Sequence, residues 1–93
     1  MNVYLVSYDI EKQSDRNKLL ERIRSYGACC SVFDSSWLMT TDQNTAQIRN
    51  DLVKSINRHD RLLVTRLQGE AAWRNLENEL SQWLKNQLTP RIA

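Results

Sequence analysis

The residues best suited to chemistry are three aspartates, one histidine and one arginine that lie near segment ends. Asp9 directly follows an apolar run, Arg16 lies in the next polar stretch, and Asp34, His59 and Asp60 lie in polar segments farther along the chain. Carboxylate oxygens suit a hard cation such as Mg²⁺, which takes one or two carboxylates, keeps several waters and often bridges to a phosphate. A metal held in this way can activate water and stabilise charge on a phosphodiester.

Each of these residues also has an ordinary structural explanation. Asp34 and Asp60 are common turn residues, His59 can be a solvated loop side chain, and Arg16 can be a surface residue of a first helical turn. Asp9 is harder to explain in this way because it directly follows a strand that is expected to be buried. The residues alone leave both explanations open.

Four segments that must position these residues are expected to be strands. The unbroken apolar run Val3–Val6 favours a central strand that is covered on both faces. The predicted strands cover residues 2–9, 28–33, 37–41 and 61–67. Charged residues on the last of them, such as Arg61 and Arg66, are typical of an edge strand, where they discourage pairing with other chains.

Three further segments carry apolar residues at helical spacing. The first begins at Ser14 as N-cap and ends at Gly27, and the second is capped by Asp42 or Asn44. The third runs from residue 70 to residue 88, before Pro90. Its apolar face is expected to form core or an interface through Trp73, Leu76, Leu80 and Trp83.

The order of elements predicts an α+β fold. Strand, helix, two strands, helix and strand match the split βαβ pattern of ferredoxin-like domains, and right-handed crossovers give an antiparallel sheet of order 4-1-3-2. The 93 residues form a single domain in this interpretation, with a ferredoxin-like unit over 1–68 and an extra C-terminal amphipathic helix over 69–89. The first two helices cover one face of the sheet, and the third helix or a partner subunit covers the other.

This topology gathers the chemical residues at one rim of the sheet. Strands 2–9 and 28–33 point the same way, so their ends place Asp9 and Asp34 along one edge. The second helix returns the chain to that edge with His59 and Asp60, and the first helix begins there beside Arg16. The arrangement predicts a local acidic site built from distant parts of the chain.

The composition narrows the classes of partner. Thirteen Lys and Arg against eleven Asp and Glu give a net charge of +2, which is weaker than the clustered excess of a dedicated duplex binder. Cys29 and Cys30 are neighbours, so we expect reduced thiols on opposite faces of a strand rather than a disulfide. No stretch approaches the roughly 18 apolar residues of a membrane-spanning helix, and no signal peptide is recognised. The expected location is cytoplasmic, with no membrane partner.

Several short stretches resemble a known family. The chain is similar to the small CRISPR-associated ferredoxin-like proteins that work beside the spacer integrase, and to their toxin-like relatives of the VapD type. A closer match over nearly the whole chain is the SinR-like branch of the same superfamily. The resembling stretches are Ser7-Tyr8-Asp9, Tyr26-Gly27, Ser31-Val32-Phe33-Asp34, Asp34-Ser35-Ser36-Trp37, Ile48-Arg49-Asn50-Asp51-Leu52 and Leu67-Gln68-Gly69-Glu70-Ala71-Ala72-Trp73.

The resemblance implies a ferredoxin-like homodimer in which the strand-end aspartates of two subunits face each other. In some members this pair holds a divalent metal for phosphodiester cleavage, and other members bind DNA as a non-catalytic scaffold. The matching residues here are Asp9 for the carboxylate and Arg16 for the early basic residue of the first helix, while Asp34 stands where the family more often shows Glu. The family ends in a fifth strand, whereas residues 70–88 predict a helix, so we expect no role in spacer acquisition.

Two functional hypotheses follow. The first is a Mg²⁺- or Mn²⁺-dependent endonuclease acting on RNA or DNA, toxin-like, with Asp9 as metal ligand, Arg16 at the phosphate, and Asp34, His59 or Asp60 supporting them. The second is a non-catalytic binding or assembly module in which the C-terminal helix, through residues such as Trp83, mediates dimer or partner contacts.

Overall fold

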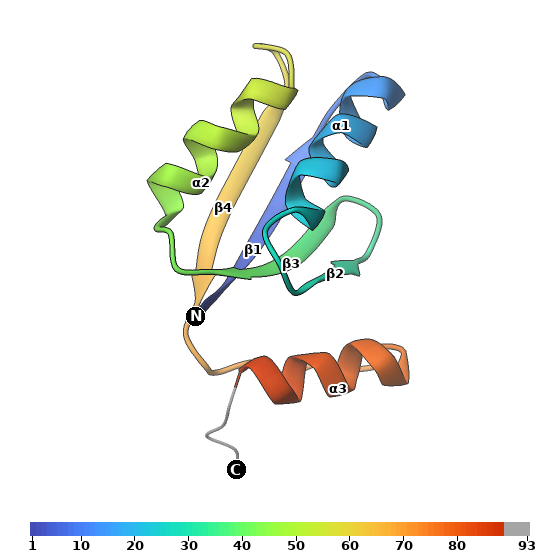
Figure 1. The fold of residues 1–93 in the computed structure, drawn as a ribbon. Coiled ribbons are helices and arrows are strands. Elements are labelled where there is room, and N and C mark those ends of the chain that lie inside the picture. The colour runs from blue at the N-terminus through green and yellow to red at the C-terminus, as the bar shows by residue number, and fades with distance from the viewer. Residues whose placement is uncertain (89–93) are drawn as a thin grey trace.

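The computed structural model describes residues 1–88 as one four-stranded sheet with helices on both sides (Figure 1). The sheet has the order β2-β3-β1-β4 and every neighbouring pair is antiparallel. This confirms the predicted α+β, ferredoxin-like fold and its sheet order. The elements are β1 (Asn2–Asp9), α1 (Gln13–Arg24), β2 (Cys29–Val32), β3 (Ser36–Thr41), α2 (Thr45–Leu52), the 3₁₀ helix η1 (Val53–Ser55), β4 (Arg61–Leu67) and α3 (Asn78–Gln87).

The central strand β1 is covered on both faces, as its unbroken apolar run predicts. Successive side chains of a strand point to opposite faces. Tyr4, Val6 and Tyr8 therefore join the core beneath α1 and α2, whereas Val3 and Leu5 join the core beneath α3. We call the first side of the sheet the front and the second side the back.

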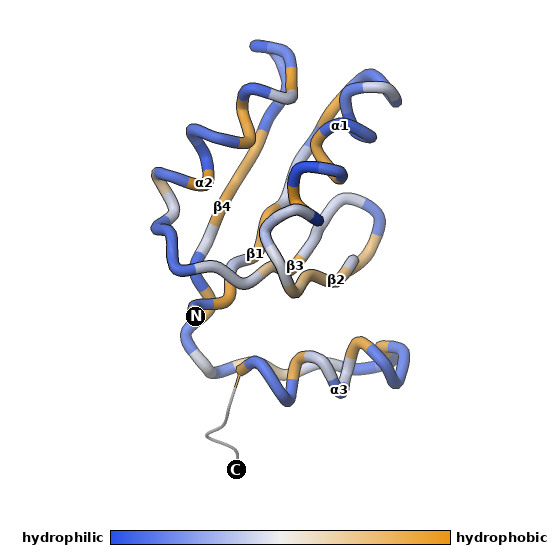
Figure 2. Tube along the Cα trace, viewed as in Figure 1, coloured by the Kyte–Doolittle hydropathy of each residue, from blue (hydrophilic) through white to orange (hydrophobic). Residues whose placement is uncertain are grey.

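The front core is the larger of the two. Leu19 and Ile23 of α1 and Ile48 and Leu52 of α2 are fully buried against it. The hydropathy pattern shows the reason, because hydrophobic residues of both helices alternate with hydrophilic ones (Figure 2). This spacing gives each helix one apolar side to bury, and both sides meet the same sheet.

The back core is formed by the third helix, as one of the two predicted arrangements has it. Val3 and Leu38 of the sheet pack with Leu80, Leu84 and Leu88, all of which are buried. The predicted start of this helix is wrong, however, because α3 begins at Asn78 and not near residue 70. Pro90, which the sequence predicts as the end of the helix, lies outside the described residues.

The late start of α3 has a local cause. Asn75 has φ 61°, in the left-handed region that Asn tolerates better than most residues, and Glu77 is extended. The chain therefore turns before the helix, and the indole Nε1 of Trp73 donates a hydrogen bond of 2.9 Å to Ser81 Oγ. Apolar periodicity alone does not predict this turn, because Trp73 and Leu76 pack on the back core although they lie before the helix.

Of the predicted N-caps of the two other helices, one is confirmed and one is wrong. Asn44 caps α2 in a complete capping box with Gln47, which confirms one of the two predicted caps. Ser14 is not the cap of α1, because that helix begins at Gln13 after Lys12 and has no side-chain cap. Ser14 is a good capping residue, but the N-cap position falls two residues earlier, at Lys12, so Ser14 lies inside the first turn.

The two cysteines lie as predicted on opposite faces of β2. Cys29 packs against the front core, Cys30 packs against the back core, and neither forms a disulfide. Burial raises the pKa of both thiols, so neither position favours the thiolate that metals and nucleophilic chemistry require.

Candidate functional site

The carboxylate of Asp9 lies at the end of β1, opposite the first residue of β4. The strand register pairs Asp9 with Arg61, and Nη2 of Arg61 donates a hydrogen bond of 2.5 Å to Asp9 Oδ2. Their side chains are 68% and 81% exposed, so water screens the pair and it contributes little to stability. By strand alternation both side chains lie on the back of the sheet.

This end of the back face is not covered by α3. The helix lies near the beginning of β1, and the far ends of β1 and β4 extend beyond it (Figure 1). Ser7 of β1 pairs with Leu63 of β4 on this part of the sheet, and Leu63 is 59% exposed. We call the uncovered part of the sheet formed by Ser7, Asp9, Arg61 and Leu63 the open face.

Asp60 has a structural role beside this site. Its carboxylate accepts hydrogen bonds from the backbone N–H of Asn57, at 2.9 Å, and of Glu11, at 3.2 Å. These bonds close the turn before β4 and join it to the loop after β1. Asp60 therefore fixes the two loops that flank Asp9.

Arg16 is also engaged within the same region. Its Nη1 donates to the carbonyl oxygen of Ile10 at 2.7 Å, and its Nη2 donates to Gln13 Oε1 at 2.7 Å. The guanidinium thus holds the loop between β1 and α1. The cation beside Asp9 in the structure is Arg61 rather than Arg16.

Asp34 and His59 are exposed at the same rim. The backbone N–H of Tyr8 donates to the carbonyl oxygen of Ser35 at 3.1 Å, which places the β2–β3 turn beside the end of β1. His59 lies in the turn that Asp60 closes. Neither side chain makes an ion pair within residues 1–88.

The topology thus places the predicted site residues at one rim of the sheet, but their side chains do not converge on one point. Within residues 1–88, no three side chains among His, Cys, Asp and Glu lie close enough to hold a metal ion together. A cation bound at Asp9 needs its other ligands from water, from a phosphate or from a second copy of the chain.

Arg61 is the site residue that sequence reasoning assigned to another role. Its charge was explained as protection of an edge strand. The signal that identifies it is the antiparallel register, because the last residue of β1 and the first residue of β4 must face each other once these strands pair. That pairing was predictable, but the alignment of the two strand ends was not.

The four residues expected at an interface all pack on the back core of their own chain. Leu80 is buried at 9% exposure, and Trp73, Leu76 and Trp83 are partly buried against the same cluster. Their part in contacts with another chain stays a prediction.

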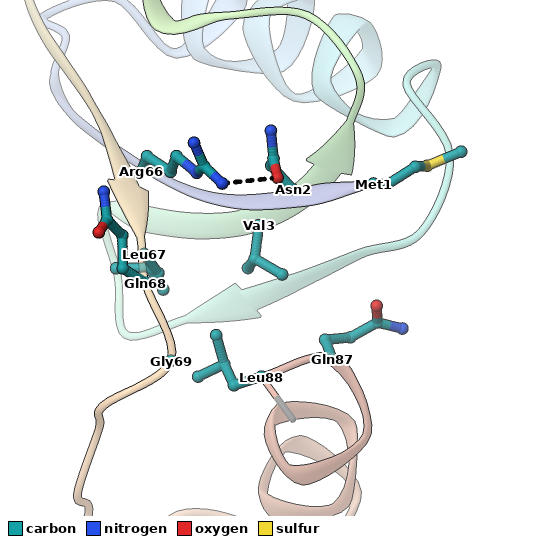
Figure 3. Close-up of a pocket in the computed structure, with 9 residues that line it drawn as sticks. All are labelled: Met1, Asn2, Val3, Arg66, Leu67, Gln68, Gly69, Gln87 and Leu88. Atoms are coloured by element: carbon teal, nitrogen blue, oxygen red, sulfur yellow. Dashed lines mark hydrogen bonds between the residues drawn. The ribbon is translucent and has the colours of Figure 1, made fainter. Parts of the chain in front are cut away.

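A shallow pocket of about 440 Å³ lies at the opposite end of β1 (Figure 3). Val3 points toward Leu88 there, and Arg66 donates a hydrogen bond of 3.0 Å to Asn2 Oδ1. The pocket also meets Gly69 and Gln87. It contains none of the candidate catalytic, metal-binding or interface residues predicted from the sequence, and it borders the last described residue.

The comparisons with known proteins support the fold. No family model matches the chain. A solved structure, the hypothetical protein TT1823 from Thermus thermophilus, is similar with a TM-score of 0.68 over 81% of this chain and 92% of that chain, at 23% sequence identity. No helix among residues 1–88 is long and apolar enough to cross a membrane.

Proposed function

We propose that this protein is a nucleic-acid-associated homodimer in which Asp9 of two subunits holds Mg²⁺ or Mn²⁺ and supports phosphodiester hydrolysis. The observation that carries the proposal is the placement of Asp9, whose exposed carboxylate lies on the open face beside the exposed apolar side chain of Leu63.

The open face has the properties of a surface that pairs with another copy. Leu63 is one of the four large hydrophobic side chains that are exposed among residues 1–88, at 59%. A contact between two copies that covers Leu63 stabilises the pair through the hydrophobic effect.

Pairing of two copies also supplies the metal ligands that residues 1–88 of one chain lack. Two Asp9 carboxylates brought within about 5 Å repel each other unless a cation lies between them. Mg²⁺ takes one or two carboxylates and completes its shell with water and phosphate oxygens. The two Asp9 carboxylates would hold such an ion, and the chemistry it would supply there is activation of water and stabilisation of charge on the phosphodiester.

Arg61 fits this mechanism better than Arg16. It lies beside Asp9 with an 81% exposed side chain, whereas Arg16 is bonded to the loop after β1. When a metal takes the carboxylate, the guanidinium of Arg61 is free to contact a phosphate, for which its planar donors are suited.

A second candidate function is a non-catalytic assembly module, and the Asp9–Arg61 pair itself favours it. Two copies meeting at the open face can exchange these partners, so that each Asp9 pairs with the Arg61 of the other copy. The charges are then compensated without a metal, and the face serves assembly alone.

Cleavage assays with single-stranded RNA and with DNA, in the presence of Mg²⁺ or Mn²⁺, separate the two functions. We expect Asp9→Asn to lower the cleavage rate at least a hundredfold, because the substitution removes the negative charge from both halves of the metal site. Asp42→Asn is the matched control, since Asp42 is 83% exposed near the N-terminus and away from the open face.

Three results count against the phosphodiesterase. One is the absence of cleavage with any of these substrates, which favours the assembly module if the protein is dimeric. Another is cleavage that survives Asp9→Asn. The third is a monomer at micromolar concentration, which rules out a site shared by two subunits.

A further inference from the structure

The ion pair at the open face differs from the ion pair between the front helices. Asp51 is 20% exposed and accepts hydrogen bonds from both Arg22 and the Tyr26 hydroxyl, so packing fixes its partners. Among residues 1–88, Asp9 accepts a side-chain hydrogen bond from Arg61 alone, and both side chains extend into water. The contact between Asp9 and Arg61 can therefore open without disturbing a core.

The guanidinium of Arg61 has unused hydrogen-bond donors. An arginine side chain carries five N–H donors, and within residues 1–88 Arg61 makes no side-chain hydrogen bond other than the one from Nη2 to Asp9 Oδ2. Arg16 differs, because its terminal nitrogens donate to Ile10 and Gln13 and are thereby tied to the loop after β1. Of these two arginines, Arg61 is the one that can change its partner without loosening a loop.

The contact between Asp9 and Arg61 also lowers the attraction of the open face for a cation. The open face of one copy contains one carboxylate and one guanidinium, so two copies bring two of each and no net charge. A divalent cation at the Asp9 carboxylate lies within roughly 5 Å of Nη2 of Arg61, and like charges at this range repel each other. Asp9 therefore binds a cation more tightly once Arg61 has left it.

A phosphodiester gives Arg61 a reason to leave. In the structure Arg61 meets Asp9 through a single nitrogen, whereas a phosphodiester accepts two parallel hydrogen bonds from the planar guanidinium. A phosphodiester that takes Arg61 frees the Asp9 carboxylate for a cation. By thermodynamic reciprocity, a cation at Asp9 also favours Arg61 on the phosphodiester.

We propose that Arg61 couples the two ligands of the open face. It pairs with Asp9 before either ligand binds and moves to a phosphodiester when one arrives, so that a divalent cation and a phosphodiester bind cooperatively. The inference rests on the proposed function and adds a regulation of the same site, because Asp9 then holds a cation tightly only together with a phosphodiester.

Mn²⁺ binding to the full chain, measured without nucleic acid from the electron paramagnetic resonance signal of the free ion, tests the coupling without cleavage. Titrations are run with and without dimethyl phosphate as the phosphodiester, at protein concentrations that sedimentation shows to be dimeric. The test variant is Arg61→Gln, and Arg61→Lys keeps the charge. The matched control is Arg58→Gln, which removes the same charge from an exposed position of the turn before β4.

The strength of an exposed ion pair supplies the expected magnitude. Without dimethyl phosphate, Arg61→Gln is expected to bind Mn²⁺ about tenfold more tightly than the wild type, because such a pair contributes a factor of up to about five and two pairs open for each ion. Arg61→Lys and Arg58→Gln are expected to stay within about threefold of the wild type. Dimethyl phosphate is expected to tighten Mn²⁺ binding more in the wild type than in Arg61→Gln. Thermal unfolding checks that these exposed substitutions keep the fold.

Three results overturn the proposal while the metal site stands. They are an unchanged Mn²⁺ affinity in Arg61→Gln, an equal gain in Arg58→Gln, and an equal effect of dimethyl phosphate on the wild type and Arg61→Gln. The absence of Mn²⁺ binding by both the wild type and Arg61→Gln refutes the metal site and the coupling together.

The outcome is separable from that of the proposed function. Cleavage that depends on Asp9, with the same Mn²⁺ affinity in the wild type and Arg61→Gln, refutes the coupling alone. Coupled binding of Mn²⁺ and dimethyl phosphate without cleavage of any nucleic acid refutes the phosphodiesterase alone.

Discussion

At the scale of single residues, Asp51 shows how one carboxylate organises its surroundings. It accepts hydrogen bonds from Arg22 Nε at 2.8 Å and from the Tyr26 hydroxyl at 2.5 Å, and so joins the end of α1 to α2. Burial raises the pKa of Asp51, but the hydrogen bonds from Arg22 and Tyr26 outweigh it and hold the pKa below the usual 3.8. Burial and the bond to Asp51 raise the pKa of Tyr26.

This shift makes stability depend on pH. A carboxyl whose pKa is lower in the folded protein binds fewer protons there than in the unfolded chain. Its contribution to the free energy of unfolding is fully present above the unfolded pKa, near 3.8, and is lost as the pH falls through the folded pKa. We therefore expect the difference in unfolding free energy between the wild type and Asp51→Asn to shrink as the pH falls from 6 toward 2.

Urea unfolding followed by circular dichroism at several pH values measures this difference. Glu21→Gln is the matched control, because Glu21 is an exposed carboxylate of α1, the helix that Asp51 contacts, and makes no ion pair within residues 1–88. A difference for Asp51→Asn that stays constant over this range contradicts the assignment.

Residue-level reasoning predicted the acids of the rim but not what each does. Asp60 closes a turn, which is the ordinary explanation that the sequence left open for it, whereas Arg16 is bonded to the loop after β1 and is more than a surface residue of a first helical turn. Asp9 keeps an exposed carboxylate, and its partner Arg61 depends on a strand register. The type of each residue can be read from the sequence. Its hydrogen-bond partner can lie as far as 52 positions away along the chain, as Arg61 does from Asp9.

At the scale of elements, α3 decides which part of the sheet is closed. Its apolar residues cover the back of β1 and β3 near the beginning of β1, and the turn at Asn75 brings Trp73 over the same cluster. The helix is shorter than its apolar pattern predicts. The pattern is correct about which residues are buried, but burial here is shared between a helix and an irregular segment.

We expect Leu84→Ala to lower the free energy of unfolding by about 2–3 kcal/mol, because it removes a side chain buried at 7% exposure and leaves a cavity on the back core. Chemical denaturation measures the loss, and Lys85→Ala is the exposed neighbour that serves as control. The dimer dissociation constant is expected to stay unchanged. A variant that keeps its stability but dissociates would show that α3 packs on another chain instead of its own sheet.

At the scale of the whole molecule, the two faces of the sheet are covered by helices to different extents. Two helices close the front, whereas one short helix closes part of the back and leaves the open face. A domain of this size buries a modest share of its surface, so covering Leu63 by association is a favourable step. In the proposed dimer, the same step would bring two Asp9 carboxylates together.

Leu63→Lys tests this association. A lysine on the open face must be desolvated when two copies meet, so we expect the dimer dissociation constant to rise at least tenfold while the fold of each subunit is kept. Sedimentation velocity over a range of concentrations measures it. Val53→Lys is the control, because Val53 is 43% exposed on the helix side and lies away from the open face. Dimerisation that is insensitive to Leu63→Lys places the contact elsewhere.

The order of elements, the topology of the sheet and the apolar residues available for the two cores were predictable from the amino-acid sequence. These follow from local periodicity and from the handedness of crossovers, which act within short stretches of chain. The sequence also limited the cap of α2 to Asp42 or Asn44, and the structure shows that Asn44 forms the capping box.

The tertiary structure alone decided how far α3 reaches over the back of the sheet, and therefore which part stays open. The pairing of β1 with β4 also brings Asp9 beside Arg61. Each of these depends on the register between segments distant in sequence, and register is fixed by the packing of whole side chains rather than by the type of any one residue.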